Sequence, residues 1–190
     1  MTDDGLSVDA RKSVAGIDLK IKTNGAEAPE LTFQAESPLA TGRGGQKLET
    51  VVWRGLKDFS TTTFSPVFHV DDASVVPAGR YADGKVAYGH RDFGDWKSVW
   101  CGVPNFDLPA LVRLARFAGV HLYAEAPVIL NADNRMMMVH NGYEGRRTVR
   151  IALPRRARVY DLPTGAFVAD GQDFDLVLGA PETKLLRLEY

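Results

Sequence analysis

One stretch, residues 96–123, constrains the fold of this chain more than any other feature: it is predicted to run strand, loop, helix, strand, and it holds the one convincing helix of the sequence. Asp107 suits the N-cap because its carboxylate can accept a backbone N–H of the first turn. Pro109 fits that turn because the first N–H groups of a helix have no acceptor within it, so the missing N–H of proline costs nothing. Gly119 suits the position after the helix, where a positive φ is cheap only for glycine. Apolar residues share one helical face, which is predicted to meet a core: 108, 111, 112, 115 and 118.

Extended sequence flanks this helix at residues 97–101 and 120–123. A strand–helix–strand order predicts a parallel crossover, because parallel neighbours need a long connection. Other segments with strand character or alternating polarity lie upstream, at 17–22, 31–34, 48–53, 64–70 and 80–88. We therefore predict a β-rich α/β domain with one clear crossover helix over residues 1–125.

Short extended segments separated by turn residues fill the rest of the chain, residues 126–190. They lie at 128–131, 135–140, 147–152, 157–160, 166–169, 174–178 and 183–188. Close, regular spacing of this kind predicts a small antiparallel β-sandwich. The densest basic run, 155–158, is predicted to be an exposed turn rather than a phosphate-binding patch.

Composition excludes few function classes but narrows the partners. The 190 residues carry a net charge of −1, which gives no general attraction to nucleic acid or to anionic membranes. No apolar run approaches the roughly 20 residues that span a bilayer, and the N-terminus lacks a signal-peptide pattern. The one cysteine permits no internal disulfide. We expect a cytoplasmic protein that binds neither nucleic acid nor membrane.

Cys101 and the four histidines are the obvious candidates for nucleophilic or metal chemistry. Cys101 ends a predicted strand well before the helix, whereas a nucleophile elbow leads directly into one, so a structural cysteine is predicted. The histidines show no i,i+4 pair and no neighbouring cysteine. They are His69, His90, His121 and His140. We predict no catalytic residue, no metal site and no cofactor, although a metal site assembled in space stays open.

Several carboxylates lie near predicted strand ends: Asp71, Asp72, Asp92, Asp95 and Glu125. Two of them could form a glycosidase pair if the fold held them roughly 5–10 Å apart. Roles in turns and caps are the simpler interpretation.

Aromatic residues offer a second kind of site, because they stack on sugars and are enriched at protein interfaces. The predicted sugar or interface contacts are Trp53, Trp96, Trp100 and Tyr123. Tyr81 and Tyr88 are further candidates for the same stacking surface, and core packing is the alternative for all six. Residues 136–138, three methionines, are predicted to fill a core or an interface.

Three segments together resemble the C-terminal portion of large bacterial β-galactosidase-like glycoside hydrolases. The first is GDWKSVWCGVP at 94–104 with LPALVRLARFAGVHLY at 108–123. The second is NRMMMVHNGYEGRRTVRIALP at 134–154. The third combines VYDLPTG at 159–165 with TKLLRL at 183–188.

The resemblance implies an order of parts. In those enzymes a catalytic (β/α)8 barrel precedes a flavodoxin-like domain, similar to class I glutamine amidotransferases and called the trimerisation domain, and a small β-sandwich closes the chain. Residues 1–125 would match part of that trimerisation domain, and 126–190 the sandwich. The barrel and its paired carboxylates are missing from this sequence, as are the opening strands of a full flavodoxin-like sheet.

The resulting expectation is a non-catalytic accessory and oligomerisation region of a β-galactosidase-like glycoside hydrolase. Its expected partners are further copies of itself or a catalytic barrel domain, with carbohydrate as an additional ligand. Two alternatives stay open: a stand-alone carbohydrate-binding module, and a small glycoside hydrolase that uses strand-end carboxylates.

Overall fold

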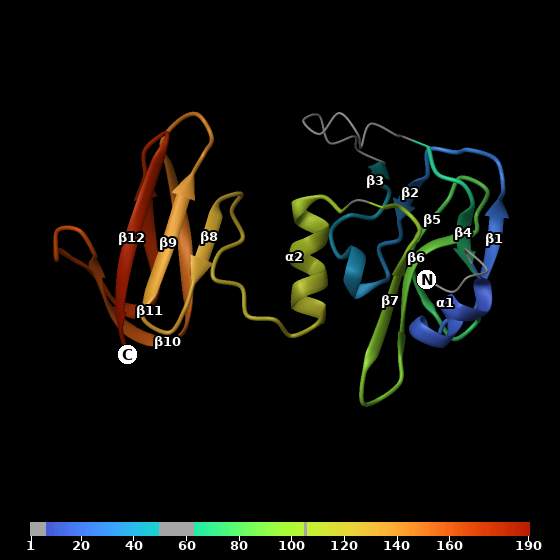
Figure 1. The fold of residues 1–190 in the computed structure, drawn as a ribbon, viewed down its shortest axis with the longest axis horizontal. Helices are drawn as coiled ribbons and strands as arrows, with labels where there is room; N and C mark the ends of the chain where they lie inside the picture. Colours follow the sequence, from blue (N-terminus) through green and yellow to red (C-terminus); the bar gives the residue numbers. More distant parts are fainter. Residues whose placement is uncertain (1–6, 50–62, 105) are drawn as a thin grey trace. The chain divides into compact units, whose positions relative to one another are not determined.

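The computed structural model describes residues 7–49, 63–104 and 106–190. The chain divides into two compact units, Met1–Ala118 (unit 1) and Gly119–Tyr190 (unit 2). Figure 1 shows that strands dominate both units, as predicted. Residues on both sides of the predicted boundary at 125, from Tyr123 to Val128, pack against the core of unit 2.

Unit 1 is built on a seven-stranded sheet in which every recorded pairing is antiparallel. The order is β1-β4-β6-β5-β2-β3, and β7 pairs with β6 off this path. The strands are β1 (Leu19–Thr23), β2 (Glu30–Phe33), β3 (Lys47–Glu49), β4 (Val67–Val70), β5 (Val76–Arg80), β6 (Val86–Asp92) and β7 (Lys97–Cys101).

The predicted parallel crossover is wrong. β7 pairs antiparallel with β6, and residues 120–123 form no strand among the described pairings. These residues alternate in polarity, but they belong to unit 2, where the carbonyl of Tyr123 accepts the N–H of Ala152 at 2.8 Å. The α/β crossover expected of a flavodoxin-like sheet is therefore replaced by an antiparallel sheet with helices beside it.

The central helix itself, α2 (Leu108–Phe117), forms where predicted. The Asp107 side chain accepts the N–H of Ala110 at 2.9 Å, and Gly119 has φ of +71°. The N-cap and the glycine after the helix are thus confirmed. A shorter helix, α1 (Val8–Ala15), was not predicted; Ser7 caps it and Gly16 ends it with φ of +65°. A 3₁₀ turn, η1 (Pro38–Ala40), completes the helical elements described in unit 1.

The face by which α2 packs on unit 1 differs from the predicted one. Ala110 is fully buried, and Leu114 and Phe117 pack against the main core cluster with it. Leu108 and Leu111, predicted to be inside, are 40% and 47% exposed. Ala110, Leu114 and Phe117 also lie at helical spacing, so α2 is apolar on two sides, and periodicity alone cannot select the packed one.

Unit 2 is one five-stranded antiparallel sheet in the order β11-β10-β12-β9-β8. Its strands are β8 (Ile129–Ala132), β9 (Met136–Asn141), β10 (Arg147–Asp161), β11 (Phe167–Leu178) and β12 (Glu182–Glu189). Alternate residues of β10, β11 and β12 enclose a single buried cluster that includes Ile151, Leu178 and Leu186. The predicted antiparallel pairing is confirmed, but all five strands pair in one sheet rather than in the two sheets of a sandwich, and the strand breaks predicted within β10 and β11 are wrong.

A bulge explains those breaks. The register of β10 against β11 shifts between Ala152 and Ala157, the segment that contains Pro154 and the start of the basic run. Proline cannot donate to a ladder, and a bulge accommodates it without ending the strand. The basic run is therefore exposed as predicted, but it lies in a strand, where Arg156 pairs with Asp170 at 2.9 Å.

Candidate functional site

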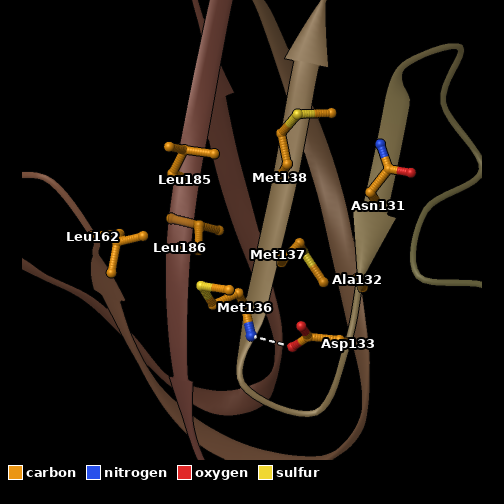
Figure 2. A pocket seen from close by; sticks show the side chains of 9 residues that line it. All are labelled: Asn131, Ala132, Asp133, Met136, Met137, Met138, Leu162, Leu185 and Leu186. Atoms are coloured by element: carbon orange, nitrogen blue, oxygen red, sulfur yellow. Dashed lines mark hydrogen bonds between the residues drawn. The ribbon is translucent and has the colours of Figure 1, made fainter.

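A hollow of about 420 Å³ lies on the outer surface of unit 2 (Figure 2). We call it the methionine hollow. It is lined by Asn131, Ala132, Asp133, Met136, Met137, Met138, Leu162, Leu185 and Leu186. Its lining is mostly apolar, which is unusual for the exposed side of a sheet.

Strand register produces the methionine hollow. Along β9 the burial alternates, so Met137 and Val139 face the core while Met136 and Met138 point outward. Met138 lies opposite Leu185 of β12. The N–H of Leu162 donates to the carbonyl of Leu185 at 2.8 Å, which brings Leu162 to the same surface. Met136, Leu185 and Leu162 are 49%, 41% and 41% exposed.

Asp133, at the polar rim of the methionine hollow, uses its carboxylate to stabilise the turn before β9. Asp133 accepts the backbone N–H groups of Arg135 and Met136, each at 2.7 Å. These two hydrogen bonds hold the pKa of Asp133 below its usual value, so the group stays a carboxylate at neutral pH. The hollow is suited to packing against an apolar surface, and methionine side chains adapt well to that task.

The outer face of α2, formed by Leu108, Leu111, Val112, Ala115 and Ala118, is the second apolar surface. The helix beneath it is held firmly. The guanidinium of Arg43, which is 6% exposed, donates two hydrogen bonds to the carboxylate of Asp107, at 2.6 and 2.7 Å. The same guanidinium lies 4.2 Å from the ring centre of Phe33. The bidentate pair fixes the start of α2 against the η1 loop.

The carboxylates named as glycosidase candidates serve as ion-pair and turn residues. Asp71 pairs with Lys20 at 2.6 Å, and this hydrogen bond lowers the pKa of Asp71. Burial alone would raise the pKa of Asp72, but hydrogen bonds from Ser74 and the Asp18 backbone, together with Arg91 at 3.0 Å, lower it overall. The general acid of a glycosidase instead needs a raised pKa, so that it is still protonated when it meets the substrate.

The other two aspartates and the glutamate add no acid pair. Asp92 accepts the N–H of Gly94 at 2.8 Å and lies 3.9 Å from Lys97. Asp95 lies at the exposed turn before β7, and Glu125 is exposed in unit 2. The alternative of a small independent hydrolase therefore gains no support from the geometry of the named residues.

Cys101 is not poised as a nucleophile. Its S–H donates to the carbonyl of Val103 at 3.3 Å, and burial raises the thiol pKa to about 12. Only the thiolate attacks, so this cysteine is unreactive at neutral pH.

The four histidines are separate from one another in their contacts. His69 and His90 are buried in unit 1, and burial lowers the pKa of both. In unit 2, His121 Nε2 lies 2.9 Å from the carbonyl oxygen of Ala152, and His140 Nδ1 lies 2.9 Å from the Thr183 hydroxyl. Across the described ranges no three His, Cys, Asp or Glu side chains gather as metal ligands would.

The predicted aromatic contacts fall in different surroundings. Trp96 is 48% exposed and stacks on Phe93, with ring centres 4.2 Å apart and planes at 5°. Trp100 packs against the cluster around Ile17 and meets Phe68 edge-on at 6.5 Å. Tyr123 belongs to unit 2 and packs against its core.

The remaining aromatic candidates add no exposed side chain to a sugar-stacking surface in the described residues. Tyr81 and Tyr88 are buried in the core of unit 1. Trp53 lies outside the described residues.

Known proteins resemble this chain in structure. No protein-family model matches it, and neither does any curated protein. Among solved structures, the β-galactosidase from Bacillus circulans sp. alkalophilus superposes with a TM-score of 0.57 at 17% identity, covering 93% of this chain and 25% of that one. The chain shares its fold with one quarter of that enzyme.

Two further structures agree. Gan42B, a GH42 β-galactosidase from G. stearothermophilus, gives a TM-score of 0.60 at 12% identity, covering 98% of this chain and 25% of that one. The β-galactosidase from the haloarchaeon Halorubrum lacusprofundi gives 0.53 at 15% identity, with 100% and 25% covered. Identities this low show the fold alone. At that level the predicted resemblance to β-galactosidases is confirmed, and the chain spans a quarter of their length.

The sequence predicts only part of these surfaces. Residues 136–138 are predicted to fill a core or an interface, and their alternation is the signal that places Met136 and Met138 outside. Leu162 and Leu185 are not predicted beside them, because these residues meet only through hydrogen bonds between separate segments. Leu111 is exposed although it is predicted to face the core, since either apolar side of α2 satisfies the helical period.

No helix in the part of the chain that the structure describes is both long enough and apolar enough to cross a bilayer.

Proposed function

We propose that this chain is a non-catalytic accessory and oligomerisation region of a β-galactosidase-like glycoside hydrolase. In this role it packs against a catalytic barrel domain or a sister subunit and helps to frame a carbohydrate cleft. One observation carries the proposal: 93% to 100% of the chain superposes on a quarter of three β-galactosidases. Under this proposal residues 1–125 correspond to a reduced, antiparallel form of the trimerisation domain, and 126–190 to the terminal sandwich.

Two exposed apolar surfaces support a packing role. Each surface lies on a fixed element of the fold. The Arg43–Asp107 ion pair fixes the start of α2, and the paired strands β8, β9 and β12 carry most of the methionine hollow. Burying a large apolar side chain stabilises a complex by roughly 1.5–3 kcal/mol, so a few such residues at each surface suffice to anchor a domain.

Association is the test. The chain is studied by analytical ultracentrifugation over a range of concentrations, alone and mixed with the catalytic domain of the Bacillus circulans sp. alkalophilus enzyme. We expect self-association or binding, and we expect Leu111→Glu or Met138→Glu to weaken it by about tenfold or more, because each places a charge in an apolar contact. Thr148→Glu, at an exposed position on β10, is the matched control. A monomer at every concentration with no affinity for the catalytic domain would refute the proposal.

A second candidate function, carbohydrate binding, is favoured by the Trp96–Phe93 pair. An exposed indole backed by a parallel ring is a suitable stacking surface for a sugar. Calorimetry against β-linked oligosaccharides tests it, with Trp96→Ala as the variant and Tyr143→Ala, another exposed aromatic, as the control. Absence of heat at millimolar sugar removes this candidate.

A further inference from the structure

A smaller hollow in unit 1, of about 280 Å³, has a different character from the methionine hollow. Its walls come from α1, from the segment leading into β4, and from the end of β7. The walls that matter here are Arg11, Phe64, Pro66, Phe68, Trp100 and Pro104. We call it the Arg11 hollow.

The Arg11 hollow holds a cation for which the described residues provide no counterion. The guanidinium of Arg11 lies 4.3 Å from the centre of the Phe68 ring. No acidic residue lines the hollow, and no ion pair to Arg11 is found in residues 7–49, 63–104 and 106–190. Its neighbour Lys12 is paired with Asp18, and Arg91 is paired with Asp72. A guanidinium stays charged at every physiological pH, so the site carries a positive charge that no described residue neutralises, beside apolar walls.

Hydrogen-bond donors are in excess at the same place. Within the described chain, Arg11 Nε and Trp100 Nε1 are buried and have no acceptor. The other nearby donors are satisfied: the Tyr81 hydroxyl donates to the carbonyl of Phe68 at 2.8 Å, and the Cys101 thiol donates to that of Val103. Buried donors in folded proteins nearly always find a partner, so two left unpaired at one hollow are informative.

We infer that the Arg11 hollow binds a small organic carboxylate with an apolar body. The carboxylate accepts hydrogen bonds from the Arg11 guanidinium and neutralises its charge, with the Trp100 indole N–H turned toward it by a small side-chain movement. The body of the ligand packs against the rings of Phe64 and Phe68 and the two prolines. A neutral sugar would not neutralise the guanidinium, and a phosphate would bury more oxygens than the Arg11 guanidinium and the Trp100 N–H can satisfy. The inference does not depend on the proposed docking role.

Benzoate is a suitable probe, and benzamide is its neutral match in shape. Binding is followed by two-dimensional ¹H–¹⁵N spectra of the full chain, in which each tryptophan gives one indole signal. The Trp100 signal is assigned from its loss in Trp100→Phe. We expect benzoate to shift the Trp100 indole and Arg11 Nε–H signals to saturation, with an affinity about tenfold or more above that of benzamide, because a charged pair replaces a neutral contact.

Two substitutions of one residue isolate the charge. Arg11→Gln should lower the benzoate affinity by about tenfold or more, whereas Arg11→Lys should keep part of it. Lys12→Gln, one position along α1, should leave the affinity unchanged. The spectrum of each variant shows directly whether it is folded.

The inference is overturned by any of four results. These are no saturable shift at tens of millimolar benzoate, an equal affinity for benzamide, an unchanged affinity in folded Arg11→Gln, or an equal response of the Trp100 signal to galactose.

Discussion

The two units of this chain are stabilised in contrasting ways. Unit 2 is a regular sheet whose ion pairs lie outside: both partners of the Arg150–Asp175 pair are more than half exposed. Unit 1 has shorter strands and relies on buried polar contacts between distant segments. Arg43 reaches Asp107, and Arg91 reaches Asp72. Unit 2 thus keeps its ion pairs at the exposed surface and buries the polar side chain of Asn141, which donates to the carbonyls of Gly145 and Gly179. Unit 1 instead places two of its ion pairs at partly buried positions.

The largest effect is expected where the core of unit 2 is cut. Leu186 is fully buried, while Leu185, the preceding residue of β12, is 41% exposed on the opposite face. Leu186→Ala should lower the free energy of unfolding by about 2–5 kcal/mol, because it removes packed methyl groups and leaves a cavity. Leu185→Ala should cost less than about 1 kcal/mol. Urea unfolding followed by circular dichroism measures both.

If Leu186→Ala and Leu185→Ala lowered the free energy of unfolding equally, unit 2 could not be a sheet with only one packed face. Such a result would show that the methionine hollow is covered in solution. The same pair of variants therefore sharpens the docking proposal, because concentration-dependent stabilisation at Leu185 would identify that cover as a second copy.

A polar contact should matter nearly as much in unit 1. Arg43→Met should lower the free energy of unfolding by about 2–4 kcal/mol, since it leaves Asp107 without its partner and loosens the start of α2. The effect falls toward the lower end if water reaches Asp107, whose side chain is 39% exposed. The matched change in unit 2, Arg150→Met, should alter stability by about 0.5 kcal/mol or less.

Tryptophan fluorescence is the measurement for the Arg43 variant, because all three tryptophans precede residue 118 and so belong to unit 1. A small effect of Arg43→Met, comparable with that of Arg150→Met, would contradict the distinction between the two units.

The same distinction explains how far the sequence could be interpreted alone. In unit 2 most strand positions follow from alternation, and the breaks predicted within β10 and β11 are wrong because a bulge at Pro154 shifts the register without ending either strand. In unit 1 the capping residues of α2 were local and therefore predictable. Its packed side was not, because the choice between Leu111 and Leu114 is made by the sheet it meets.

The residues of the methionine hollow and the Arg11 hollow could likewise be predicted only where they are close in the sequence. Met136 and Met138 could be found from their alternation in one strand. Leu162 and Leu185 join them through hydrogen bonding between segments, and Arg11 meets Trp100 although the two are far apart in the sequence. No local pattern records contacts of that kind.

The smallest expected effect concerns pH. Burial, together with nearby Lys85 for His69 and Lys97 for His90, holds the pKa of both histidines of unit 1 below its ordinary value near 6.5. Above pH 6.5 these residues are neutral in both folded and unfolded chains. As the pH falls below 6.5, the unfolded chain binds protons that the folded chain does not, so stability is lost until the folded pKa is reached.

The urea midpoint of unit 1, followed by tryptophan fluorescence, should therefore fall between pH 7.5 and pH 5. His90→Gln should flatten this slope, because glutamine cannot take up the proton that favours unfolding. His140→Gln, which changes a partly exposed histidine of unit 2, should leave the slope as it is. A slope that survives both His69→Gln and His90→Gln would show that other groups cause the acid sensitivity. Asp71 and Asp72 would not be those groups: their pKa values are also lowered, but they affect stability only below about pH 4.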